Sequence, residues 1–571
     1  MKIKFNYELK KEDKISSYQI IDLLLKNRKI ENIEEFLNPK NPLNISLFDF
    51  NSSFANEFNE VLKILTEIKE KNQMVVVYTD YDADGITGGA ILWETLYLLG
   101  FKVMPYVPNR KTEGYGFSIT GINNVIEKFN PSLIISVDHG ITKVKEVEYA
   151  KKKGIKIIIT DHHLKAEKIP KADAIFHISA LSGAGVSYFF SKEIYKNLKT
   201  QISKIKILES NFSSDYLIFA SIGTVADLVP LIGSSRSIVK YGLESFFKTH
   251  RIGIKQILKE AGIEGKKITP YEIGFIIAPR INAVGRLKDA TDALRLLCTK
   301  KEKKAKYLAL YLGEKNRIRQ SLVEEAVNQA EKILKKEINS FKQLPKIIVL
   351  KSENWHEGII GLIAAKITEL FFRPTIVLTK NDGFYKGSAR SIPNFDITSF
   401  LKKLKDFLID VGGHKQAAGF TIEKEKIKSF KKESLKLADK LIKEKDLERE
   451  ILVDLKIPIQ KINLNWVRIL ENLYPFGIGN PEPLFFSEVK ISNLRFVGKE
   501  NRHLKIFVQD ENHHSTLELI AFNQGENFKN FYRNQKIKVI YTLLIDSWSK
   551  QKTVKGKLIT WLNNDISSTI I

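Results

Sequence analysis

The sequence predicts a multidomain α/β protein that ends in a small β-barrel, and three observations support this fold class. Short runs of consecutive apolar, β-branched residues alternate with helical stretches over roughly residues 55–240 and again after residue 343. Consecutive rather than alternating apolarity, with helical connections, indicates parallel strands that are buried on both faces. A long charged stretch with helical spacing separates the two regions, and short alternating strands follow residue 446. Several short strands with turns between them indicate an OB-type barrel.

Length, charge and cysteine content narrow the class of protein. The 571-residue chain is long enough for several domains with separate cores. Its formal charge of +25 favours a polyanionic partner, nucleic acid before anionic membrane, although part of the lysine excess reflects compositional bias. Cys298 is the only cysteine, which excludes a disulfide framework and a Cys-rich metal site. No apolar run approaches the roughly 20 residues of a membrane span, so we expect a cytoplasmic protein without membrane association.

Five parts are predicted along the chain. They are an N-terminal helical lead-in at 1–54, a first α/β domain at 55–299, a connecting helix at 300–342, a second α/β domain at 343–445 and the barrel at 446–571. The lead-in has short helices and turn residues but no recognisable chemistry. The connecting stretch contains no proline, so we expect one helix that bridges the two α/β domains.

Acidic residues follow the first predicted buried strand. The segment "MVVVYTDYDADGITGG" places Asp80, Asp82 and Asp84 directly after that strand. Carboxylates this close together either keep a proton or hold a cation. The D-x-D-x-D-G spacing also opens an EF-hand calcium loop, but Ile91 stands where that loop needs a bidentate glutamate. A strand rather than a helix precedes the motif, so we reject the calcium loop.

Polar residues follow other predicted strands in the same way. In chain order these are Asp138 and His139 in "LIISVDHG", and Asp161, His162 and His163 in "IKIIITDHH". A further acid, Asp227 in "SIGTVADLVPL", follows an apolar stretch and could join them. The carboxyl ends of parallel strands meet at one edge of a sheet, where open α/β folds bind ligands. Each motif alone also has an ordinary explanation, since acids at strand ends often cap helices. Together they predict one crevice that contains Asp82, Asp84, Asp138, His162 and Asp227.

The donor atoms of this crevice indicate the kind of metal. Carboxylates mixed with imidazole, without a thiolate, favour Mn²⁺ or Mg²⁺ over a structural zinc. The number of ligands fits two ions. Two divalent ions at such a site lower the pKa of a water molecule and so favour hydrolysis of a phosphate ester.

Several segments resemble the DHH phosphoesterase superfamily. "DYDADG", "VDHG", "TDHH" and "GTVAD" stand in the order of its four motifs. Other segments resemble the single-strand-specific exonucleases of that superfamily over roughly residues 55–500; they include "PNRKTEGYGF", "APRINAVGRL", "HEGIIGLIAAKI", "GSARS", "GGHKQAAGF" and "LYPFGIGNPEPLF". There are two departures: His139 replaces a small or amide residue, and the segment "AIFHISALSGAGVSY" lacks an Asn-Pro pair. Neither departure affects a predicted carboxylate ligand.

The resemblance implies a role for each residue of the crevice. The implied metal ligands are Asp80 and Asp82 on one ion, Asp84, His162 and Asp227 on the other, and Asp138 bridging both. Asp161 is expected to orient His162, and His163 to contact a phosphate oxygen or to protonate the leaving 3′ oxygen. His139 adds a ligand, a proton donor or nothing. The implied catalytic residues are Asp82, Asp84, Asp138, His162, His163 and Asp227.

The resemblance also implies phosphate-binding residues in both α/β domains. They are Arg110, Arg280 and Asn282 in the first domain, and Ser388, Arg390, Gly412, Gly413 and His414 in the second. Arginines give forked contacts to phosphate, and a glycine-rich turn lets backbone amides approach it closely. The second domain would be the DHH-associated domain, which closes on the catalytic one with the substrate between them.

The predicted barrel supports a polymeric substrate, because OB-type barrels stack unpaired bases on aromatic side chains within a basic groove. The candidates are Phe496, His503, Lys505, Phe507 and Trp548. Aromatic residues on a small barrel more often belong to its core, so we assign no single residue there.

We therefore expect a metal-dependent, single-stranded-DNA-specific 5′–3′ exonuclease. The resemblance implies an exodeoxyribonuclease that releases 5′-mononucleotides by two-metal phosphodiester hydrolysis in DNA repair and recombination. The implied partners are single-stranded DNA, single-strand-binding protein and a RecQ-type helicase, and nothing in the sequence requires more than a monomer.

Two other functions remain open from the sequence. One is a DHH phosphoesterase acting on short oligonucleotides, cyclic dinucleotides or pyrophosphate, for which the first two domains suffice. The other is a catalytically silent strand-binding scaffold, which would have lost metal ligands. Every acid of the four motifs is present here.

Overall fold

The computed structural model of the protein describes residues 2–10, 12–110, 112–114, 116–199, 204–287, 289–341, 344–381, 383–512, 515–528, 531–546 and 552–563. The chain forms two compact units. The larger unit comprises residues 3–313 and 452–571 and contains the first α/β region and the barrel; the smaller comprises residues 1–2 and 314–451 and contains the second α/β region. The predicted fold class is confirmed.

A five-stranded parallel sheet in the order β3-β2-β4-β5-β6 lies at the centre of the first α/β region. Its strands are β2 (Val75–Thr79), β3 (Val103–Tyr106), β4 (Leu133–Val137), β5 (Lys156–Asp161) and β6 (Ala174–His177). Every residue of β2 and β4 is buried, as expected of consecutive β-branched residues in a sheet that is covered on both faces. Thr79 pairs with Val137, and Val137 with Thr160. The strands therefore end side by side.

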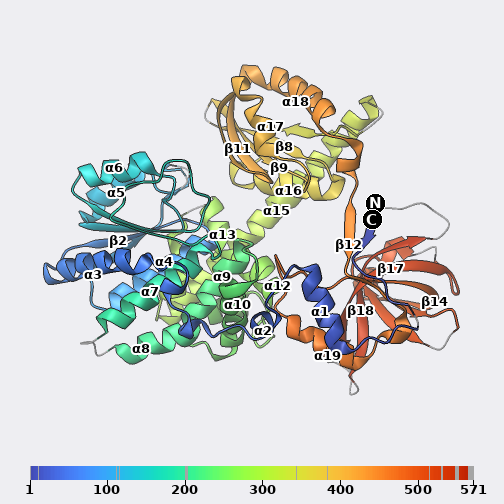
Figure 1. The fold of residues 1–571 in the computed structure, drawn as a ribbon. Coiled ribbons are helices and arrows are strands. Elements are labelled where there is room, and N and C mark those ends of the chain that lie inside the picture. Colours follow the sequence, from blue (N-terminus) through green and yellow to red (C-terminus); the bar gives the residue numbers. More distant parts are fainter. Residues whose placement is uncertain are drawn as a thin grey trace. The chain divides into compact units, whose positions relative to one another are not determined.

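Helices cover both faces of this sheet (Figure 1). The helices on one face are α5 (Ile119–Phe129) and α6 (Val144–Lys152), and those on the other are α3 (Phe54–Glu70), α4 (Ala83–Leu98) and α7 (Gly183–Leu198). Helix α4 is buried on nearly all sides, because its sequence is apolar or small through most of its length.

Further helices complete this core. They are α8 (Ile205–Ser210), α9 (Tyr216–Ala226), α10 (Gly233–Ser245), α11 (Ile252–Glu260), α12 (Pro270–Glu272), the π-helical turn η5 (Ile273–Ile277), α13 (Ala278–Leu287) and α14 (Thr291–Cys298). Helix α9 packs against α4, α7 and α10. It thereby brings the segment after Ala226 to the sheet edge where β2, β4 and β5 end.

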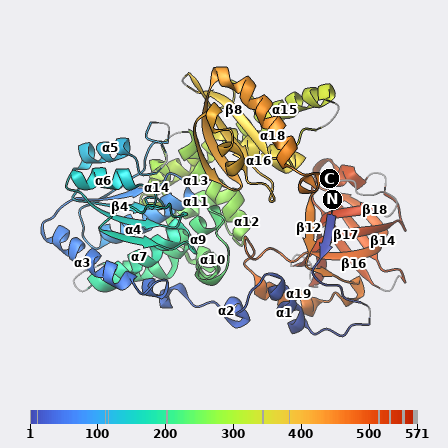
Figure 2. The same cartoon turned by 45° about the horizontal axis from the view of Figure 1, so that its top comes forward.

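The end of the chain forms a closed five-stranded barrel in the order β14-β15-β16-β18-β17, closed by pairing between β14 and β17. Its strands are β14 (Phe485–Val497), β15 (His503–Gln509), β16 (Thr516–Ala521), β17 (Lys536–Asp546) and β18 (Thr553–Asn563), and β13 (Leu455–Lys456) pairs parallel to β14. Helices α1 (Ser17–Asn27) and α19 (Leu464–Leu470) share one hydrophobic core with the barrel (Figure 2).

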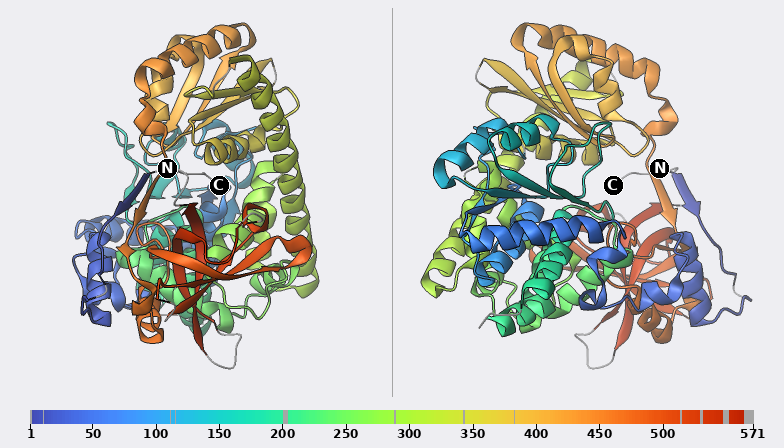
Figure 3. Two further views of the ribbon diagram at one scale, coloured as in Figure 1. Left: turned by 90° about the vertical axis from the view of Figure 1, so that its right-hand side faces the viewer. Right: turned by 60° about the vertical axis from the view of Figure 1, so that its left-hand side comes forward.

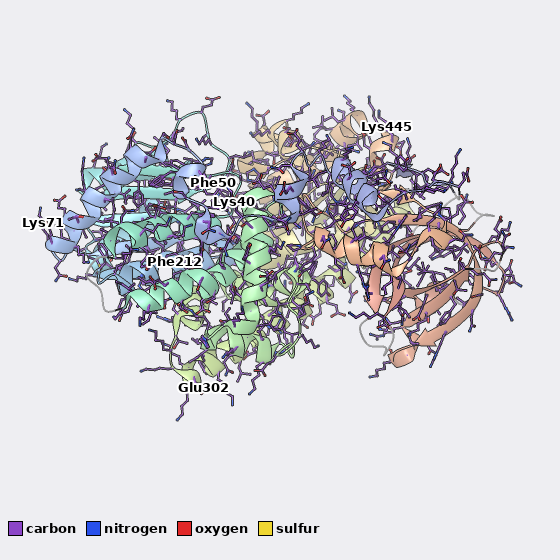
Figure 4. All side chains as sticks on the ribbon, turned by 60° about the horizontal axis from the view of Figure 1, so that its bottom comes forward. Lys40, Phe50, Lys71, Phe212, Glu302 and Lys445 are labelled. Atoms are coloured by element: carbon purple, nitrogen blue, oxygen red, sulfur yellow. The ribbon has the colours of Figure 1, made fainter. Side chains whose placement is uncertain are left out.

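The N-terminal lead-in connects the barrel to the first α/β core through buried hydrogen bonds. The guanidinium of Arg236 in α10 is fully buried and donates to the carbonyls of Phe36, Asn472, Tyr474 and Pro475. Nearby helical side chains also donate to lead-in carbonyls, including that of Lys40, which Figure 4 labels. The lead-in carries no predicted chemistry, but it is a firm structural link within the larger unit.

The smaller unit has a five-stranded mixed sheet in the order β10-β11-β9-β8-β7. Its strands are β7 (Ile348–Lys351), β8 (Thr375–Asn381), β9 (Phe384–Arg390), β10 (Leu408–His414) and β11 (Ala417–Glu423). One face packs against α16 (Ile360–Phe371) and part of α15 (Glu302–Phe341), and the other against α17 (Ile397–Lys402) and α18 (Ile427–Leu441). Strand β12 (Glu450–Val453) follows and pairs with β1 (Lys2–Phe5).

Helix α15 runs without interruption from Glu302 to Phe341 (Figure 3). The two units divide within it, between Gly313 and Glu314. It is rich in charge. No helix in the described part of the chain combines the length and apolarity that crossing a membrane requires.

Candidate metal and phosphate site

The first group of predicted residues lies where three neighbouring strands end. Asp80 follows β2 and its backbone N–H donates to the Val137 carbonyl at 3.3 Å. Asp138 follows β4 and donates in the same way to Thr160 in β5 at 3.0 Å. His162 comes directly after the last residue of β5. The ladder between strands therefore fixes the backbone of two candidate ligands.

Two helices bring the other acids to the same place. Asp82 caps the start of α4, where its Oδ1 accepts the N–H groups of Asp84 and Gly85, both at 3.1 Å. Asp84 is buried in the first turn of α4. Asp227 caps the end of α9. The predicted crevice thus combines strand ends with helix ends.

The side chains form three overlapping groups whose ligand atoms lie within 4.8 Å of one another. The groups are Asp80 with Asp82 and Asp138, Asp84 with His162 and Asp227, and Asp138 with His162 and His163. The Nε2 atom of His162 is 3.1 Å from Oδ1 of Asp138, 3.5 Å from Oδ2 of Asp227 and 3.8 Å from Oδ2 of Asp84. All six predicted metal ligands therefore meet in one place.

The donor set fits divalent cations. Oδ1 of Asp138 and Nε2 of His162 are buried, and neither has a hydrogen-bond partner within the described ranges. Buried polar atoms are nearly always hydrogen-bonded or bound to an ion, because leaving them unpaired costs desolvation free energy. Carboxylate oxygens with imidazole nitrogen are the donors that Mn²⁺ and Mg²⁺ accept in proteins. These residues are suited to hold such ions.

Burial and mutual repulsion hold protons on these carboxylates when no cation is bound. Burial, reinforced by the charge of Asp82, raises the pKa of Asp84 to about 7. Burial and the charge of Asp84 raise the pKa of Asp227 to about 8. The same two causes raise the pKa of Asp138 well above its usual range. A divalent cation would replace these protons.

Glycines make room for the acids. A Cβ atom at Gly183 would collide with Asp138, and one at Gly223 would collide with Oδ1 of Asp84. The N–H groups of Gly183 and Ala184, at the start of α7, donate to the two oxygens of Asp84 at 2.6 and 2.9 Å. These close approaches fix the orientation of the Asp84 carboxylate.

Asp138 has a strained backbone. Its φ of 69° lies in the left-handed region, which residues other than glycine seldom adopt. Such strain costs about 1–3 kcal/mol and gathers at functional sites. The strained turn directs the Asp138 side chain toward His162, in the middle of the acidic cluster.

Asp161 orients His163 rather than His162, which corrects the prediction from the resemblance. Oδ1 of Asp161 lies 2.8 Å from Nδ1 of His163. Its contact with His162 is to the backbone N–H, at 2.7 Å, and not to the ring. Burial lowers the pKa of His163, but the hydrogen bond to Asp161 and the charges of Asp161 and Asp227 together outweigh burial and raise that pKa to about 9. Burial lowers the pKa of His162 to about 4. At neutral pH His163 is a cation, and His162 is neutral and able to bind a metal.

His139 belongs to no metal-binding group among the residues described. Its ring is buried and packs between Tyr78 and Phe117, with ring centres 5.2 and 5.8 Å away. Burial lowers its pKa to about 4. Of the three roles considered, the packing favours the third, a buried ring that neither binds a metal nor donates a proton.

Arg110 is exposed next to the acidic cluster. Its guanidinium lies 5.4 Å from the ring centre of Tyr81, the residue between the first two acids. A guanidinium stacked on an aromatic ring keeps its N–H edges available for a phosphate. Its position agrees with the predicted role.

Arg280 and Asn282 brace the site instead of pointing freely toward a substrate. Nε of Arg280 donates to Glu260 at 2.7 Å, and a terminal N–H donates to the Ile276 carbonyl at 2.8 Å. Oδ1 of Asn282 accepts the backbone N–H of Ala83 at 2.7 Å. The structure therefore corrects the expectation of a readily available forked contact from Arg280. Asn282 instead stabilises the turn that carries Asp82 and Asp84.

The predicted phosphate-binding residues of the smaller unit lie on neighbouring strands. Across β10, β11 and β9, Gly412 is in register with Gly419 and Ser388. In the next row of the same face, His414 is in register with Ala417 and Arg390. All five predicted residues, Gly413 included, therefore belong to one continuous patch of sheet.

Two further glycines open this patch, and the predictions missed both. A Cβ at Gly412 would have open space around it, and one at Gly419 would have only a carbonyl 3.9 Å away. Gly361, at the start of α16, lies against the side chains of Ser388 and Arg390, each 3.1 Å from where its Cβ would be. Glycine in the quoted segments "AAGF" and "HEGIIGL" was the available signal.

The barrel residues that were candidates for base stacking differ in their exposure. Phe496 is 37% exposed, whereas His503 and Phe507 are half-buried. Lys505 pairs with Glu518 at 2.9 Å. Trp548 lies outside the described residues. No cluster of stacked aromatic rings is found among those of the five that the structure describes.

Comparisons with known proteins agree with these observations. Sequence models of three families match the chain: "DHH family, N-terminal domain" at residues 74–212, "DHHA1 domain" at 344–444 and "RecJ OB domain" at 453–559. The single-stranded-DNA-specific exonuclease RecJ of Haemophilus influenzae is 30% identical over 557 residues, which cover 95% of this chain and 96% of that protein. The Escherichia coli protein of the same name is 31% identical over 482 residues, covering 81% and 83%.

The RecJ of Bacillus subtilis is 32% identical over 494 residues, covering 84% of this chain, but the chain spans only 60% of that longer relative. Among solved structures, RecJ from Thermus thermophilus in complex with Mn²⁺ matches with a TM-score of 0.78 and 26% identity, over 98% of this chain and 80% of that one. A second structure, exonuclease RecJ bound to manganese, has a TM-score of 0.57 and 31% identity, over 66% and 94%.

Proposed function

Because the chain belongs to the RecJ family of DHH proteins, we propose that it is an exonuclease that degrades single-stranded DNA from the 5′ end. The observation that most supports this activity is the meeting of six metal-binding side chains at the ends of β2, β4 and β5. The closed barrel adds a surface of the class that binds single strands. The proposed products are 5′-mononucleotides.

Asp80, Asp82 and Asp138 would hold one Mn²⁺ or Mg²⁺, and Asp84, His162 and Asp227 a second, with Asp138 next to both groups. Bound divalent ions at such a site polarise the phosphate and lower the pKa of water. A neutral His162 ring has one unprotonated nitrogen to offer a metal, and Nε2 is the ring atom that lies among the carboxylates. The three carboxylates with raised pKa values lose their protons when cations bind.

His163 is the proposed proton donor. Its Nδ1 is held by Asp161, so Nε2 is the ring atom that can face a substrate. As the oxygen of water forms its bond to phosphorus, water loses a proton to the solvent and the bond from phosphorus to the 3′ oxygen breaks. Nε2 of His163 gives its proton to that 3′ oxygen, which leaves as the 3′ hydroxyl of the released nucleotide. The remaining strand keeps a 5′ phosphate for the next cycle.

Phosphates further along the strand would be held by Arg110 in the larger unit and by Ser388, Arg390 and the segment Gly412 to His414 in the smaller unit. Arg280 would contribute only after its ion pair with Glu260 opens. On this proposal, residues 55–299 form the catalytic domain, 343–445 the phosphate-binding domain and 446–571 the strand-binding domain, with 300–342 as the connecting helix and 1–54 as the lead-in.

The proposed setting is DNA repair and recombination in the cytoplasm. Single-strand-binding protein and a RecQ-type helicase would supply unwound strands to a monomeric enzyme. Two other functions are less well supported. A phosphoesterase for short substrates leaves the barrel without a role, and a silent scaffold has no need of the complete metal-binding set.

A time course with Mn²⁺ tests the proposal. Single strands labelled at either end are compared with a matched duplex, an RNA strand and a dinucleotide, using Asp138→Asn as the inactive control. Early loss of the 5′ label as mononucleotide, with the duplex intact, is expected. Cleavage of the dinucleotide while long strands survive would reject the assigned substrate and keep the chemistry. Unaltered activity of the folded Asp138→Asn protein would reject the metal site.

A further inference from the structure

Two stacked aromatic rings are exposed on the helical segment that leads to the metal site. Tyr271 and Phe275 are 61% and 68% exposed, with ring centres 4.9 Å apart and planes inclined by 28°. Phenylalanine has no polar atom for water to solvate, so a pair of this size in water is costly unless a ligand covers it. An exposed stack of two rings offers an outer ring face on which a nucleobase can stack.

The backbone beneath this aromatic pair is rigid. α12, η5 and α13 follow one another without a break from Pro270 to Leu287, and Thr269 caps the start through a capping box with Glu272. On the inner side, Ile273 and Ile277 are fully buried in the core. η5 is a π-helical turn, a local distortion that is frequent at functional sites. A rigid support lowers the entropic cost of stacking a base.

One end of the segment contacts the residues that carry the metal site. A Cβ at Gly274, next to Phe275, would lie 3.7 Å from Val225, two residues before Asp227. Leu228, the residue after Asp227, is 66% exposed and has a φ of 58°. Exposed apolar side chains are therefore present both next to Asp227, at Leu228, and on the helical turn η5 that packs against this segment, at Phe275.

The other end of the segment lies toward the barrel (Figure 2). Nζ of Lys267 is 5.1 Å from the ring centre of Tyr474, which precedes β14. Lys266 and Lys267 are exposed immediately before α12. In the same junction, the backbone N–H of Leu231 donates to the Ile478 carbonyl at 2.7 Å. Cations suited to phosphates thus flank an aromatic surface suited to bases.

We propose that Tyr271 and Phe275 stack unpaired bases of the substrate strand on its way from the metal site to the barrel. This inference rests on the proposed function and specifies a new subsite for it. Stacking accepts every base, because each has a π face, and it is available only to bases that are not already stacked inside a duplex. The pair therefore contributes to single-strand preference without reading sequence.

The test compares long and short substrates with the full-length protein and Mn²⁺. For a strand of about 20 nucleotides, Phe275→Ala is expected to raise KM about tenfold at unchanged kcat, the usual effect of losing one stacked base. The kcat/KM for a dinucleotide, which cannot reach the pair, stays at the wild-type value. Phe275→Trp retains wild-type KM on the long strand, whereas Phe275→Leu does not, because leucine is apolar but cannot stack.

Tyr307→Ala is the matched control. Tyr307 is 67% exposed and stacks on Tyr311 in α15, with planes inclined by 9°. It lies five residues after Glu302, which Figure 4 labels at the lower edge of the core. Tyr307→Ala should change neither the KM for the long strand nor the kcat/KM for the dinucleotide. Equal effects of Tyr307→Ala and Phe275→Ala, or full rescue by leucine, would overturn the proposal.

Binding measurements separate this inference from the proposed function. Fluorescence anisotropy with Asp138→Asn, with and without Phe275→Ala, reports strand binding in the absence of cleavage. Binding that depends on Phe275, combined with a wild-type protein that cleaves no single strand with Mn²⁺, would reject the exonuclease and keep the stacking site. Cleavage or binding of long strands that ignores Phe275 would reject the stacking site alone, as would self-association that Phe275→Ala abolishes. No binding of single strands at all would reject both.

Discussion

Nδ1 of His163 lies 2.8 Å from Oδ1 of Asp161, and this pair makes His163 the cation of the active site. Burial lowers the pKa of His163, but this hydrogen bond and the charges of Asp161 and Asp227 together raise it to about 9. A proton donor must carry its proton, so we expect kcat to fall as the pH rises through about 9. Asp161→Asn should move that fall toward the usual histidine pKa, below pH 7. The measurement is kcat against pH with Mn²⁺ at saturation.

Removal of the His163 side chain tests directly whether His163 is the proton donor. His163→Ala should lower kcat by about 10²- to 10⁴-fold, the range for loss of a general acid. Strand affinity and metal binding should change little, because the two groups proposed to hold ions, Asp80 with Asp82 and Asp138 and Asp84 with His162 and Asp227, do not include His163. A kcat limb near pH 9 that survives in His163→Ala would assign that limb to another group.

The acidic cluster should make the metal-free protein less stable at high pH. Burial first, and then neighbouring carboxylates, raise the pKa of Asp227 to about 8. A carboxyl whose pKa is higher in the folded state binds more protons when folded, so its contribution to stability falls as pH rises from about 4 through about 8. We expect Asp227→Asn to raise the Tm of the chelated protein at pH 8 by roughly 2 °C, and not at pH 4.

With metal bound, the wild-type protein should instead be more stable than Asp227→Asn at pH 8. With Mn²⁺ present, the wild-type protein gains stability by binding the ion in its folded state, whereas Asp227→Asn, which lacks one ligand, gains less. Differential scanning fluorimetry at several pH values measures both effects. A Mn²⁺-induced Tm shift that is equal in the two proteins would remove Asp227 from the metal site.

The positions of the acidic residues could be predicted because two simple patterns coincide. Uninterrupted β-branched runs identify the buried strands, and the next polar residue must lie at the sheet edge. The choice between His162 and His163 as partner of Asp161 could not be predicted, because it depends on ring orientations within three consecutive residues. The ion pair between Arg280 and Glu260 could not be predicted either, because only the packing of α11 brings Glu260 close to Arg280.

Backbone contacts leave still weaker signals in a sequence. The lead-in showed no chemistry because its partners use its carbonyls, which every residue type has. The sequence also gives no sign that Gly183 and Gly223 lie against the acids. Each looks like an ordinary glycine of a helix or helix end, and only the packing of the neighbouring helices brings it close to a carboxylate. Sequence patterns therefore identify the groups that do chemistry better than the groups that hold them.

Gly223→Ala should disrupt the metal site. The added Cβ would collide with Oδ1 of Asp84, which the start of α7 holds in place, and with the Cβ of Ala184 in that helix. We expect Mn²⁺ affinity to fall about tenfold or more, as for other supports of metal ligands, and activity to fall with it. Isothermal titration with Mn²⁺ measures the affinity. Ser221→Ala in the same helix is the control, and equal behaviour of the two variants would contradict the steric argument.

Arg236→Ala should destabilise the larger unit more than any exposed arginine substitution. The guanidinium is fully buried and also lies 3.9 Å from the ring centre of Phe36. Its loss leaves carbonyls of the lead-in and of the segment before β14 unpaired, at about 1–3 kcal/mol for each that stays buried and dry. A total loss of about 3 kcal/mol in the free energy of unfolding is expected, measured by chemical denaturation.

The matched control separates burial from charge. Arg295 is 55% exposed and pairs with Asp292 at 3.0 Å, so Arg295→Ala should cost less than about 1 kcal/mol. Because Arg236 touches no residue of the metal site, kcat per folded Arg236→Ala molecule should stay near the wild-type value, while its affinity for long strands falls if the barrel shifts. Equal stability of the two variants would show that the buried carbonyls find water, and that the lead-in does not hold the barrel to the core.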